Sequence, residues 1–343
     1  MENLLGTLLR VLPPRFEVTL LGSSAEVLGY VARSRPGTAV RLVPPVHGKR
    51  NVLAIISQVT ALRRIRPDVL HASLGQLYQA QYPLFAAVVN RIPAVAVVHG
   101  VFPRNPRRQD ILVRWLMRRM LVVAGVSEFV RLSIESEFRL PPGTARVLYN
   151  GIDDPCGSTA AVVREEPGTT VLGAVGRCSP EKGFDVLIRA LAELPDCRLV
   201  VLGDGPARPE LARLARELGV AGRVRFAGWV DPPWALKWGF DVLVAPSRVE
   251  GFGLVAVEAI LAGIPVIASR VGGFAEMIDD GATGLLVEPG DAASLAAAIR
   301  QLADDPLERS TIAERARASV AGRFTTDAMA RAYVAVFDEV RRR

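Results

Sequence analysis

The sequence predicts an α/β protein with two domains, each built on a parallel sheet that is covered by helices on both faces. Three observations predict this fold class. Short β-branched runs alternate with helical patterns along the chain, as they do in parallel sheets. The chain has 343 residues, 50% of them hydrophobic, which is enough for two cores. A stretch rich in turn formers and acids, residues 149–168, separates two series of strands and is interpreted as the interdomain linker.

The strands are predicted in order from the apolar runs that carry them. In the first half these runs occupy residues 16–22, 68–73, 94–100 and 121–127, and in the second half residues 171–177, 198–205, 223–228, 241–247 and 265–269. The linker assigns residues 1–152 to an N-terminal domain and residues 153–343 to a C-terminal domain. Ligands of such sheets bind beyond the carboxyl ends of the strands, so the loops after these runs are candidate walls of a site.

The loop after residues 241–247 opens the most informative segment, PSRVEGFGLVAVEAILAG at residues 246–263. Gly251 and Gly253 permit a tight turn, and the apolar helix from Leu254 begins with N–H groups that are free to meet an anion. Along a helix axis, Glu250 and Glu258 would be separated by roughly 12 Å. That spacing favours two separate hydroxyl-binding tasks over a metal site. From this window alone, the alternative is a helix that caps with Glu250 and exposes Glu258.

A second candidate wall follows the strand that begins at Val171. The strand ends at Gly176, and Arg177, Lys182 and Gly183 come before the next helix. A guanidinium can fork onto phosphate oxygens, and an ammonium can act as a mobile point charge. The pair is therefore suited to a diphosphate, although arginine and lysine in surface loops are usually only solvated.

Composition excludes several other classes of protein. No apolar run approaches the length of about 18 residues that a membrane-spanning helix needs. The first residues, MENLLGTLLRVLPP, include Glu2 and Arg10, which argues against a secretory signal. The three cysteines, Cys156, Cys178 and Cys197, are odd in number and lack metal-type spacing. They are expected to be reduced thiols of a cytoplasmic protein.

Charge is distributed unevenly along the chain. Residues 1–150 hold 20 Lys+Arg against 8 Asp+Glu, a net charge of +12, whereas the remainder holds 22 against 27, a net charge of −5. Residues 104–120 mix arginines with apolar side chains, which would suit an amphipathic helix on an anionic membrane surface. The alternative is an ordinary surface helix with apolar residues in the core. No nucleic-acid-binding motif accompanies the basic residues, so a nucleic-acid partner is not predicted.

The combination of these segments resembles the retaining family-4 glycosyltransferases (glycosyltransferases group 1), which have the two-domain GT-B fold. The second half resembles them nearly continuously from Val171 to Asp291, through GRCSPEKGFDVLIRAL, VLGDGP, RVRFAGWV, the long run from DVLVAPS to RVGG, and GATGLLVEPGD. The first half resembles them through AVAVVHG, LVVAGVS and VLYNGID. The resemblance implies two Rossmann-like domains that face each other across a cleft. The final helix, about residues 326–343, is expected to pack back on the first domain.

The resemblance implies a role for each matching residue. Arg177 and Lys182 would bind the donor diphosphate and neutralise the charge that grows as the nucleotide leaves. Glu258 would accept hydrogen bonds from the ribose, and Glu250 would hold hydroxyls of the transferred sugar. His99 would approach that sugar from the first domain, and its alternative is a histidine satisfied at a strand end.

The remaining implied contacts involve the backbone and the base. The sugar and phosphate site would be lined by the backbone of Gly251, Phe252, Gly253, Leu254 and Val255. The base pocket would be edged by Trp229 and Val230. The donor would be a UDP-, GDP- or ADP-sugar, and the sequence does not identify which.

The resemblance also implies a reaction. The protein would be a hexosyltransferase that moves sugar with retention, in a front-face reaction in which a donor phosphate oxygen helps to deprotonate the acceptor. No Asp-x-Asp triplet occurs in the chain, so no metal and no cofactor are expected.

One feature departs from the family. Its members usually begin with a strand and a glycine-rich loop before the helix that residues 1–12 match, and this chain opens at that helix. The first strand of the N-terminal domain is therefore expected to be missing, either because the natural start lies upstream or because the protein works without it. A second hypothesis is then a non-catalytic nucleotide-sugar-binding subunit with a partner subunit that covers the sheet edge. A GT-B epimerase ranks behind both, because it accounts poorly for the run from Glu250 to Glu258.

The basic first half bears on the acceptor, because that domain normally supplies acceptor contacts in GT-B enzymes. A glycan or lipid-linked acceptor at the inner membrane face is the favoured hypothesis. A soluble small-molecule acceptor is the competitor.

Overall fold

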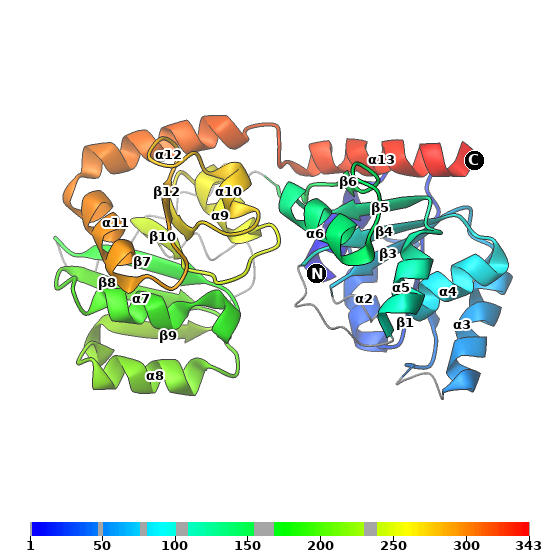
Figure 1. Ribbon diagram of the computed structural model, residues 1–343, viewed down its shortest axis with the longest axis horizontal. Helices are drawn as coiled ribbons and strands as arrows, with labels where there is room; N and C mark the ends of the chain where they lie inside the picture. Colours follow the sequence, from blue (N-terminus) through cyan, green and yellow to red (C-terminus); the bar gives the residue numbers. More distant parts are fainter. Residues whose placement is uncertain are drawn as a thin grey trace. The chain divides into compact units, whose positions relative to one another are not determined.

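The computed structural model describes residues 2–46, 51–75, 81–100, 109–153, 168–229 and 239–342 (Figure 1). The chain forms two compact units: unit 1 comprises residues 1–151 and 324–343, and unit 2 comprises residues 152–323. The boundary lies one residue before the predicted one. The last helix, α13 (Thr326–Arg342), counts with unit 1, the domain on which the family resemblance led us to expect it to pack.

Aromatic packing explains why α13 belongs to unit 1. Phe337 lies 6.0 Å from Phe16 and 5.9 Å from His71, measured between ring centroids. Tyr333 packs edge-on against the same histidine at 5.6 Å. Apolar burial of this kind is a larger stabilising contribution than the exposed ion pair between Arg15 and Asp338.

Unit 1 contains two separate parallel sheets. Its strands are β1 (Thr19–Gly22), β2 (Ala39–Leu42), β3 (Leu70–Leu74), β4 (Ala94–Val98), β5 (Val122–Gly125) and β6 (Arg146–Val147). β1 pairs with β2, and the other four pair in the order β3-β4-β5-β6. Among the described residues, no strand pairs with the second edge of β1 or of β3. The first domain thus has the predicted parallel pairing, but not as one continuous sheet.

The helices of unit 1 alternate with these strands. They are α1 (Glu2–Val11), α2 (Ala25–Ala32), α3 (Val52–Ile65), α4 (Gln81–Asn90), α5 (Gln109–Met117), α6 (Glu128–Phe138) and α13. Side-chain caps start several of them: Ser24 for α2, Asn51 for α3 and Ser127 for α6. α3, α4, α5 and α6 pack in a row, and α1 packs against α2 and α13 (Figure 1).

Unit 2 is one doubly wound sheet. Its strands are β7 (Thr170–Val175), β8 (Cys197–Leu202), β9 (Val224–Gly228), β10 (Val242–Ala245), β11 (Val266–Ser269) and β12 (Leu285–Val287). They pair in parallel in the order β12-β11-β10-β7-β8-β9. The order reverses between β7 and β10, so the topological switch point lies beside the loops that follow these two strands. Open α/β sheets bind their ligands at such a switch point, beyond the carboxyl ends of the strands.

Helices cover both faces of this sheet. They are α7 (Phe184–Leu191), α8 (Arg208–Glu217), α9 (Leu254–Leu261), α10 (Phe274–Met277), α11 (Ala292–Asp304) and α12 (Pro306–Val320), with 3₁₀ turns η1 (Pro180–Lys182) and η2 (Ala221–Arg223). α7 packs between α8 and α11 on one face, and α9 packs against α12 (Figure 1). β7, β8 and β10 are buried between these layers, with Leu172, Leu199 and Val242 fully inaccessible.

The α/β fold class and all nine predicted strand positions are confirmed. The prediction missed β2, β6 and β12. β6 has two residues and β12 has three, too few for an alternating pattern, and β2 ends in the partly exposed pair Arg41 and Leu42. Along the described stretches, no helix has both the length and the apolar composition to cross a bilayer.

Candidate functional site

The loops after β7 and β10 bring together two residues that lie far apart in the sequence. Lys182, at the end of η1, donates from Nζ to Oε2 of Glu250 at 2.7 Å. Their side chains are 25% and 14% exposed, so the pair is half-buried. This contact places the predicted diphosphate cation beside the predicted sugar carboxylate at the carboxyl-end edge of the sheet.

Arg177 follows β7 on the same loop as Lys182. Its side chain is exposed, and no hydrogen bond or ion pair to a described residue is recorded for it. An arginine that stabilises the fold would be bonded to a carboxylate or carbonyl oxygen. Arg177 is therefore free to fork onto an anion that enters this edge of the sheet.

Close backbone approaches fix the shape of these loops. A Cβ on Gly183 would lie 2.0 Å from the carbonyl oxygen of Pro246, so the loop before α7 touches the loop after β10. A Cβ on Gly203, after β8, would lie 1.9 Å from the carbonyl oxygen of Gly176. Only glycine permits either approach, and both glycines have positive φ, 66° and 135°. The three loops consequently form one tightly joined edge.

The start of α9 has the geometry that the sequence predicts. Gly253 precedes the helix with a φ of 93°, and no side chain caps it. A Cβ there would lie 2.3 Å from the ring of Phe274. Gly251 and Phe252 are buried, and Leu254 and Val255 are half-buried. The N–H groups of Ala256 and Val257 donate to the carbonyl oxygen of Gly253, which leaves those of Leu254 and Val255 to a ligand or to solvent.

Glu258 lies on the second turn of α9. Burial raises the pKa of its carboxyl group to about 7, because the charged form loses hydration there. No hydrogen bond to its carboxylate from another described residue is recorded. The prediction from the helix window that Glu258 could be a solvent-exposed residue is not what the structure shows, since this side chain is mostly buried.

The predicted base pocket is only partly described. Trp229 follows β9 and is 68% exposed, the most exposed large ring among the described residues of unit 2. Val230 lies outside the described residues. Its large exposed ring is available for stacking.

His99, the predicted site residue of unit 1, lies directly after β4. Its backbone N–H donates to the carbonyl oxygen of Leu74 at 3.0 Å. Its Nε2 atom is buried and has no hydrogen-bond partner among the described residues. Burial, with a smaller effect of His71, lowers the pKa of His99 to about 3, so the imidazole is neutral at pH 7. A buried Nε2 without a described partner differs from the alternative of a histidine satisfied at a strand end.

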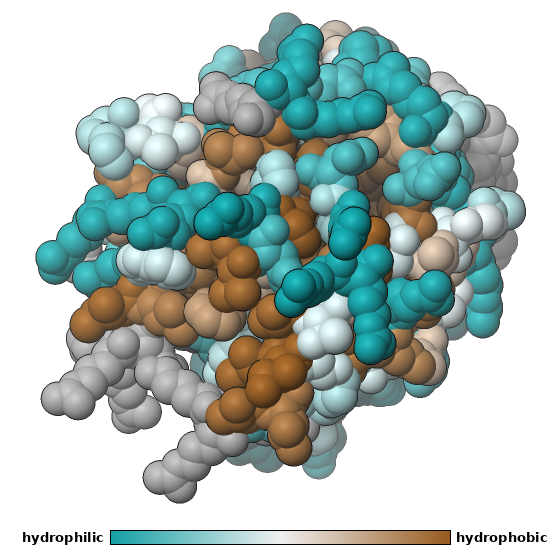
Figure 2. All heavy atoms as spheres, turned by 90° about the vertical axis from the view of Figure 1, so that its right-hand side faces the viewer, coloured by the Kyte–Doolittle hydropathy of each residue, from teal (hydrophilic) through white to brown (hydrophobic). Residues whose placement is uncertain are grey.

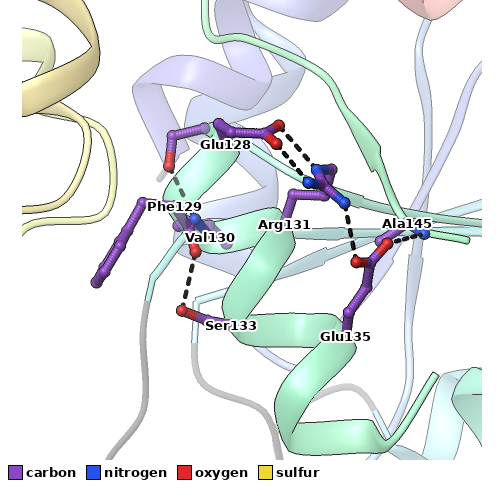
Figure 3. A network of polar contacts seen from close by, with 8 residues as sticks. Glu128, Phe129, Val130, Arg131, Ser133, Glu135 and Ala145 are labelled. Carbon is purple, nitrogen blue, oxygen red and sulfur yellow. Dashed lines mark hydrogen bonds and ion pairs between the residues drawn. The ribbon is translucent and has the colours of Figure 1, made fainter. Parts of the chain in front are cut away.

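A polar network that sequence reasoning missed fixes the neighbouring strand end. Glu135 accepts from Nη1 of Arg131 at 2.9 Å and from the backbone N–H of Ala145 at 3.0 Å (Figure 3). Arg131 also donates to Glu128, at the start of α6. The i, i+3 and i, i+4 spacing of these charges was the available signal. The network joins α6 to Ala145, the residue that precedes β6.

Among the described residues, the cysteines do not cluster with other potential metal ligands. Cys178 and Cys197 are buried free thiols, and burial raises the pKa of Cys197 to about 11. Cys156 lies outside the described residues. Within the described part of the chain, no group of three or more His, Cys, Asp or Glu side chains could hold a metal ion.

Comparison with known proteins covers both halves of the chain. The family model described as Glycosyltransferase Family 4 matches residues 1–154, and the model described as Glycosyl transferases group 1 matches residues 160–319. Glycogen synthase of Mycobacterium tuberculosis (strain ATCC 25618 / H37Rv) is 33% identical over 293 residues, which cover 80% of this chain and 69% of that protein.

Two further similarities are informative. The lipopolysaccharide core biosynthesis glycosyltransferase LpsE of Rhizobium meliloti (strain 1021) is 42% identical over 164 residues, and the match spans 48% of this chain and about half (48%) of LpsE. The crystal structure of Anabaena Alr3699/HepE in complex with UDP and glucose superposes with a TM-score of 0.83 at 24% identity. The superposition covers 98% of this chain and 95% of that one. Both units therefore have the fold of a GT-B protein.

Proposed function

This chain belongs to the family-4, group 1 glycosyltransferases, and from that membership we propose that it moves a hexose-type sugar from a nucleotide-diphosphate sugar to a glycan or lipid-linked acceptor, with retention at the anomeric carbon. The reaction is proposed to need no metal and no cofactor.

The observation that carries the proposal is the contact between Lys182 and Glu250 at 2.7 Å. It joins a cation suited to phosphate and a carboxylate suited to sugar hydroxyls at the switch point of the sheet of unit 2. Arg177 adds an exposed cation on the first loop, and Glu258 adds a mostly buried carboxylate on the second turn of α9. A nucleotide-sugar donor carries its diphosphate between the sugar and the ribose. The proposed contacts follow the same order, with Glu250 for the sugar, the two cations for the diphosphate and Glu258 for the ribose.

The residues would act on the transition state as follows. The bond from the anomeric carbon to the donor phosphate oxygen breaks, and Arg177 and Lys182 neutralise the charge left on the diphosphate. The acceptor oxygen attacks from the same face, and its proton passes to the departing phosphate oxygen. Glu250 would orient the sugar hydroxyls, and His99, neutral at pH 7, would bond to the sugar without adding charge.

The comparison structure favours one donor as the first to try. HepE was crystallised with UDP and glucose. Hydroxyl stereochemistry and base identity depend on atomic contacts that a fold does not define, so the donor is best identified by binding. A ligand that binds only the folded protein raises its melting temperature, and the rise grows with the logarithm of its concentration relative to Kd.

The test is sugar transfer or slow donor hydrolysis with radiolabelled UDP-, GDP- and ADP-glucose. Glu250→Ala and Arg177→Ala should each lower turnover by about 100-fold, the usual effect of removing one group that stabilises a transition state. Arg213→Ala is the control, because that exposed arginine pairs only with Glu217 on α8. Full turnover in the two site variants would contradict the assignment. Turnover lost in EDTA and restored by magnesium or manganese would contradict metal independence.

A second candidate function, a non-catalytic nucleotide-sugar-binding subunit, is favoured by the divided sheet of unit 1. Val18 and Gly22 accept bonds from the β2 side, so the alternate residues Thr19 and Leu21 direct their backbone groups to the other edge of β1. A partner could pair with this edge. This function predicts donor binding without turnover until a partner is supplied, whereas the enzyme turns over alone.

For the acceptor, we propose a lipid-linked or anionic molecule at the inner membrane face, reached by a peripheral, cytoplasmic protein. The predicted amphipathic helix is only partly described, because residues 101–108 lie outside the described ranges. In α5, Val113, Leu116 and Met117 pack into the core, whereas Ile111 is 69% exposed and Trp115 is 39% exposed. α5 therefore has both the buried apolar residues of an ordinary surface helix and exposed apolar residues of the kind that a membrane-binding helix needs.

The packed pair α3 and α4 supplies a larger surface of the same kind. Leu53 is 82% exposed, Ile56 53% and Val89 52%. Residues 51–66 and 81–91 contain four arginines and no acidic residue. Figure 2, which faces the side of unit 1 that carries α3 and α4, shows hydrophobic side chains at the surface beside hydrophilic ones. Apolar and cationic side chains without carboxylates favour an anionic lipid surface over a second copy of this basic unit.

A further inference from the structure

A second ion pair joins the two loops that carry Lys182 and Glu250. Arg248 lies two residues before Glu250, and Asp185 lies in the first turn of α7, three residues after Lys182. Neither residue is among those that the sequence marks as binding the donor. In the sequence both lie between Lys182 and Glu250, the two residues that are proposed to contact the donor.

The contacts of Arg248 form a clamp. Its Nη1 and Nη2 donate to Oδ1 and Oδ2 of Asp185, each at 2.7 Å, in a two-pronged pair. Nη1 also donates to the carbonyl oxygen of Pro180 at 2.8 Å. The backbone N–H of Arg248 donates to the carbonyl oxygen of Glu181 at 2.8 Å. One residue thus makes four bonds to the segment of residues 180–185.

The clamp differs from an ordinary surface ion pair. The side chains of Arg248 and Asp185 are 40% and 34% exposed, and an isolated pair of that exposure contributes little to stability. Here each of the two guanidinium nitrogens faces one carboxylate oxygen. The pKa of Asp185 is lowered, chiefly by its hydrogen bond to Arg248. The nearby approach of Gly183 to the carbonyl oxygen of Pro246 is a further close contact between the same two loops.

We infer that Arg248 is a positioning residue, which holds the Lys182 loop and the Glu250 loop in register while the site exchanges its contacts. The inference rests on the proposed function. Lys182 and Glu250 bond to each other in the structure, and each must turn toward the donor when diphosphate and sugar arrive. When that bond opens, the pair between Arg248 and Asp185 remains to join the loops.

The test compares variants of the full chain with one whose ion pair belongs to unit 1. Arg248→Ala, Arg248→Lys and Asp185→Asn remove or weaken the clamp. Arg146→Ala is the matched control, since Arg146 and Glu339 form a two-pronged pair in unit 1 with side chains 42% and 29% exposed. The measurements are calorimetric Kd for whichever of UDP-, GDP- or ADP-glucose binds the unaltered protein most tightly, kcat and KM for donor and acceptor, and melting temperature.

Arg248→Ala is expected to weaken donor binding and lower kcat by about tenfold each, with acceptor KM and the melting temperature nearly unchanged. Arg248→Lys should recover only part of the loss, because an ammonium cannot form both prongs. Asp185→Asn combined with Arg248→Ala should be no worse than the more damaging single change, since both break one contact. Arg146→Ala should leave donor binding unaltered.

Two results would overturn the inference. Donor Kd and kcat within twofold of the unaltered protein in Arg248→Ala would show that the clamp does not position the loops. Losses that track a fall in melting temperature, or that appear equally in Arg146→Ala, would show a purely structural pair. If the unaltered protein binds none of the three nucleotide sugars, the proposed function fails with the inference. Binding that Arg177→Ala abolishes and Arg248→Ala preserves removes the inference alone.

Discussion

At the scale of single residues, Glu258 shows that a group proposed to bind the donor can oppose stability. Its carboxyl group is mostly buried on α9, and burial raises its pKa to about 7 from an ordinary value of 4.5. Each tenfold change in proton affinity corresponds to about 1.4 kcal/mol, so the charged form disfavours the folded state by up to about 3 kcal/mol. A raised pKa means that this loss is absent below pH 4.5, grows as the pH rises and is complete above pH 7.

Glu258→Gln should therefore be more stable than the unaltered protein at pH 8, by about 1–3 kcal/mol, and equally stable at pH 4.5. The same change should weaken donor binding, because the amide is a poorer acceptor for ribose hydroxyls than a carboxylate. Thermal melts at the two pH values and a donor titration check both parts. Glu210→Gln, on the exposed face of α8, is the control. An equal gain at both pH values would contradict the pKa explanation.

At the scale of elements, the site depends on how closely loops approach one another. Gly183 ends η1 and begins α7 with a φ of 66°, and a Cβ there would lie 2.0 Å from the carbonyl oxygen of Pro246. Gly219 has a similar φ of 71° and open space around it. Both positions strain an L-residue by roughly 1 kcal/mol, but only Gly183 would also push two loops apart.

Gly183→Ala should consequently lose more stability than Gly219→Ala and should also weaken donor binding by at least tenfold. Gly219→Ala should leave donor binding unaltered. Urea unfolding and calorimetric donor titration of the two variants make the comparison. Equal donor affinity in both variants would mean that the contact between the loops does not shape the site.

At the scale of the whole molecule, the two halves of the chain differ in net charge. The first 150 residues carry a net charge of +12 and the remainder −5. Unit 2 holds the candidate donor site, although anions are attracted there by local cations and a helix start and not by its net charge. The excess of positive charge lies in unit 1, together with the exposed apolar residues of α3 and α4.

The protein is therefore predicted to float with vesicles of phosphatidylglycerol and phosphatidylcholine at low salt, and not with phosphatidylcholine alone. Leu53→Ser with Ile56→Ser should reduce binding several-fold without a change in charge, because burial of their side chains in the bilayer is lost. Leu307→Ser, at a leucine of α12 that is 78% exposed, is the control. No flotation with anionic vesicles at low salt would remove the membrane proposal.

Much of the fold could be predicted, because alternating strand and helix patterns and glycine turns are local properties of the sequence. The parallel strands of both halves and the glycine-punctuated start of α9 are of this kind. The divided sheet of unit 1 and the pairing order of the strands in each sheet depend on contacts between distant segments. The return of α13 to unit 1 is expected from the family resemblance, but the packing of Phe337 against Phe16 and His71 that holds it there is known only from the structure.

The same division applies to the candidate site. The sequence by itself determined the family, the residue types at the strand ends and the separation of Glu250 from Glu258 along the chain. Only the tertiary structure decided that Lys182 bonds to Glu250, that Glu258 is buried enough to change its pKa, and that Arg248 clamps the loops. The physical reason is that burial and pairing depend on segments about 70 residues apart, which meet only when β7 and β10 lie side by side in the sheet.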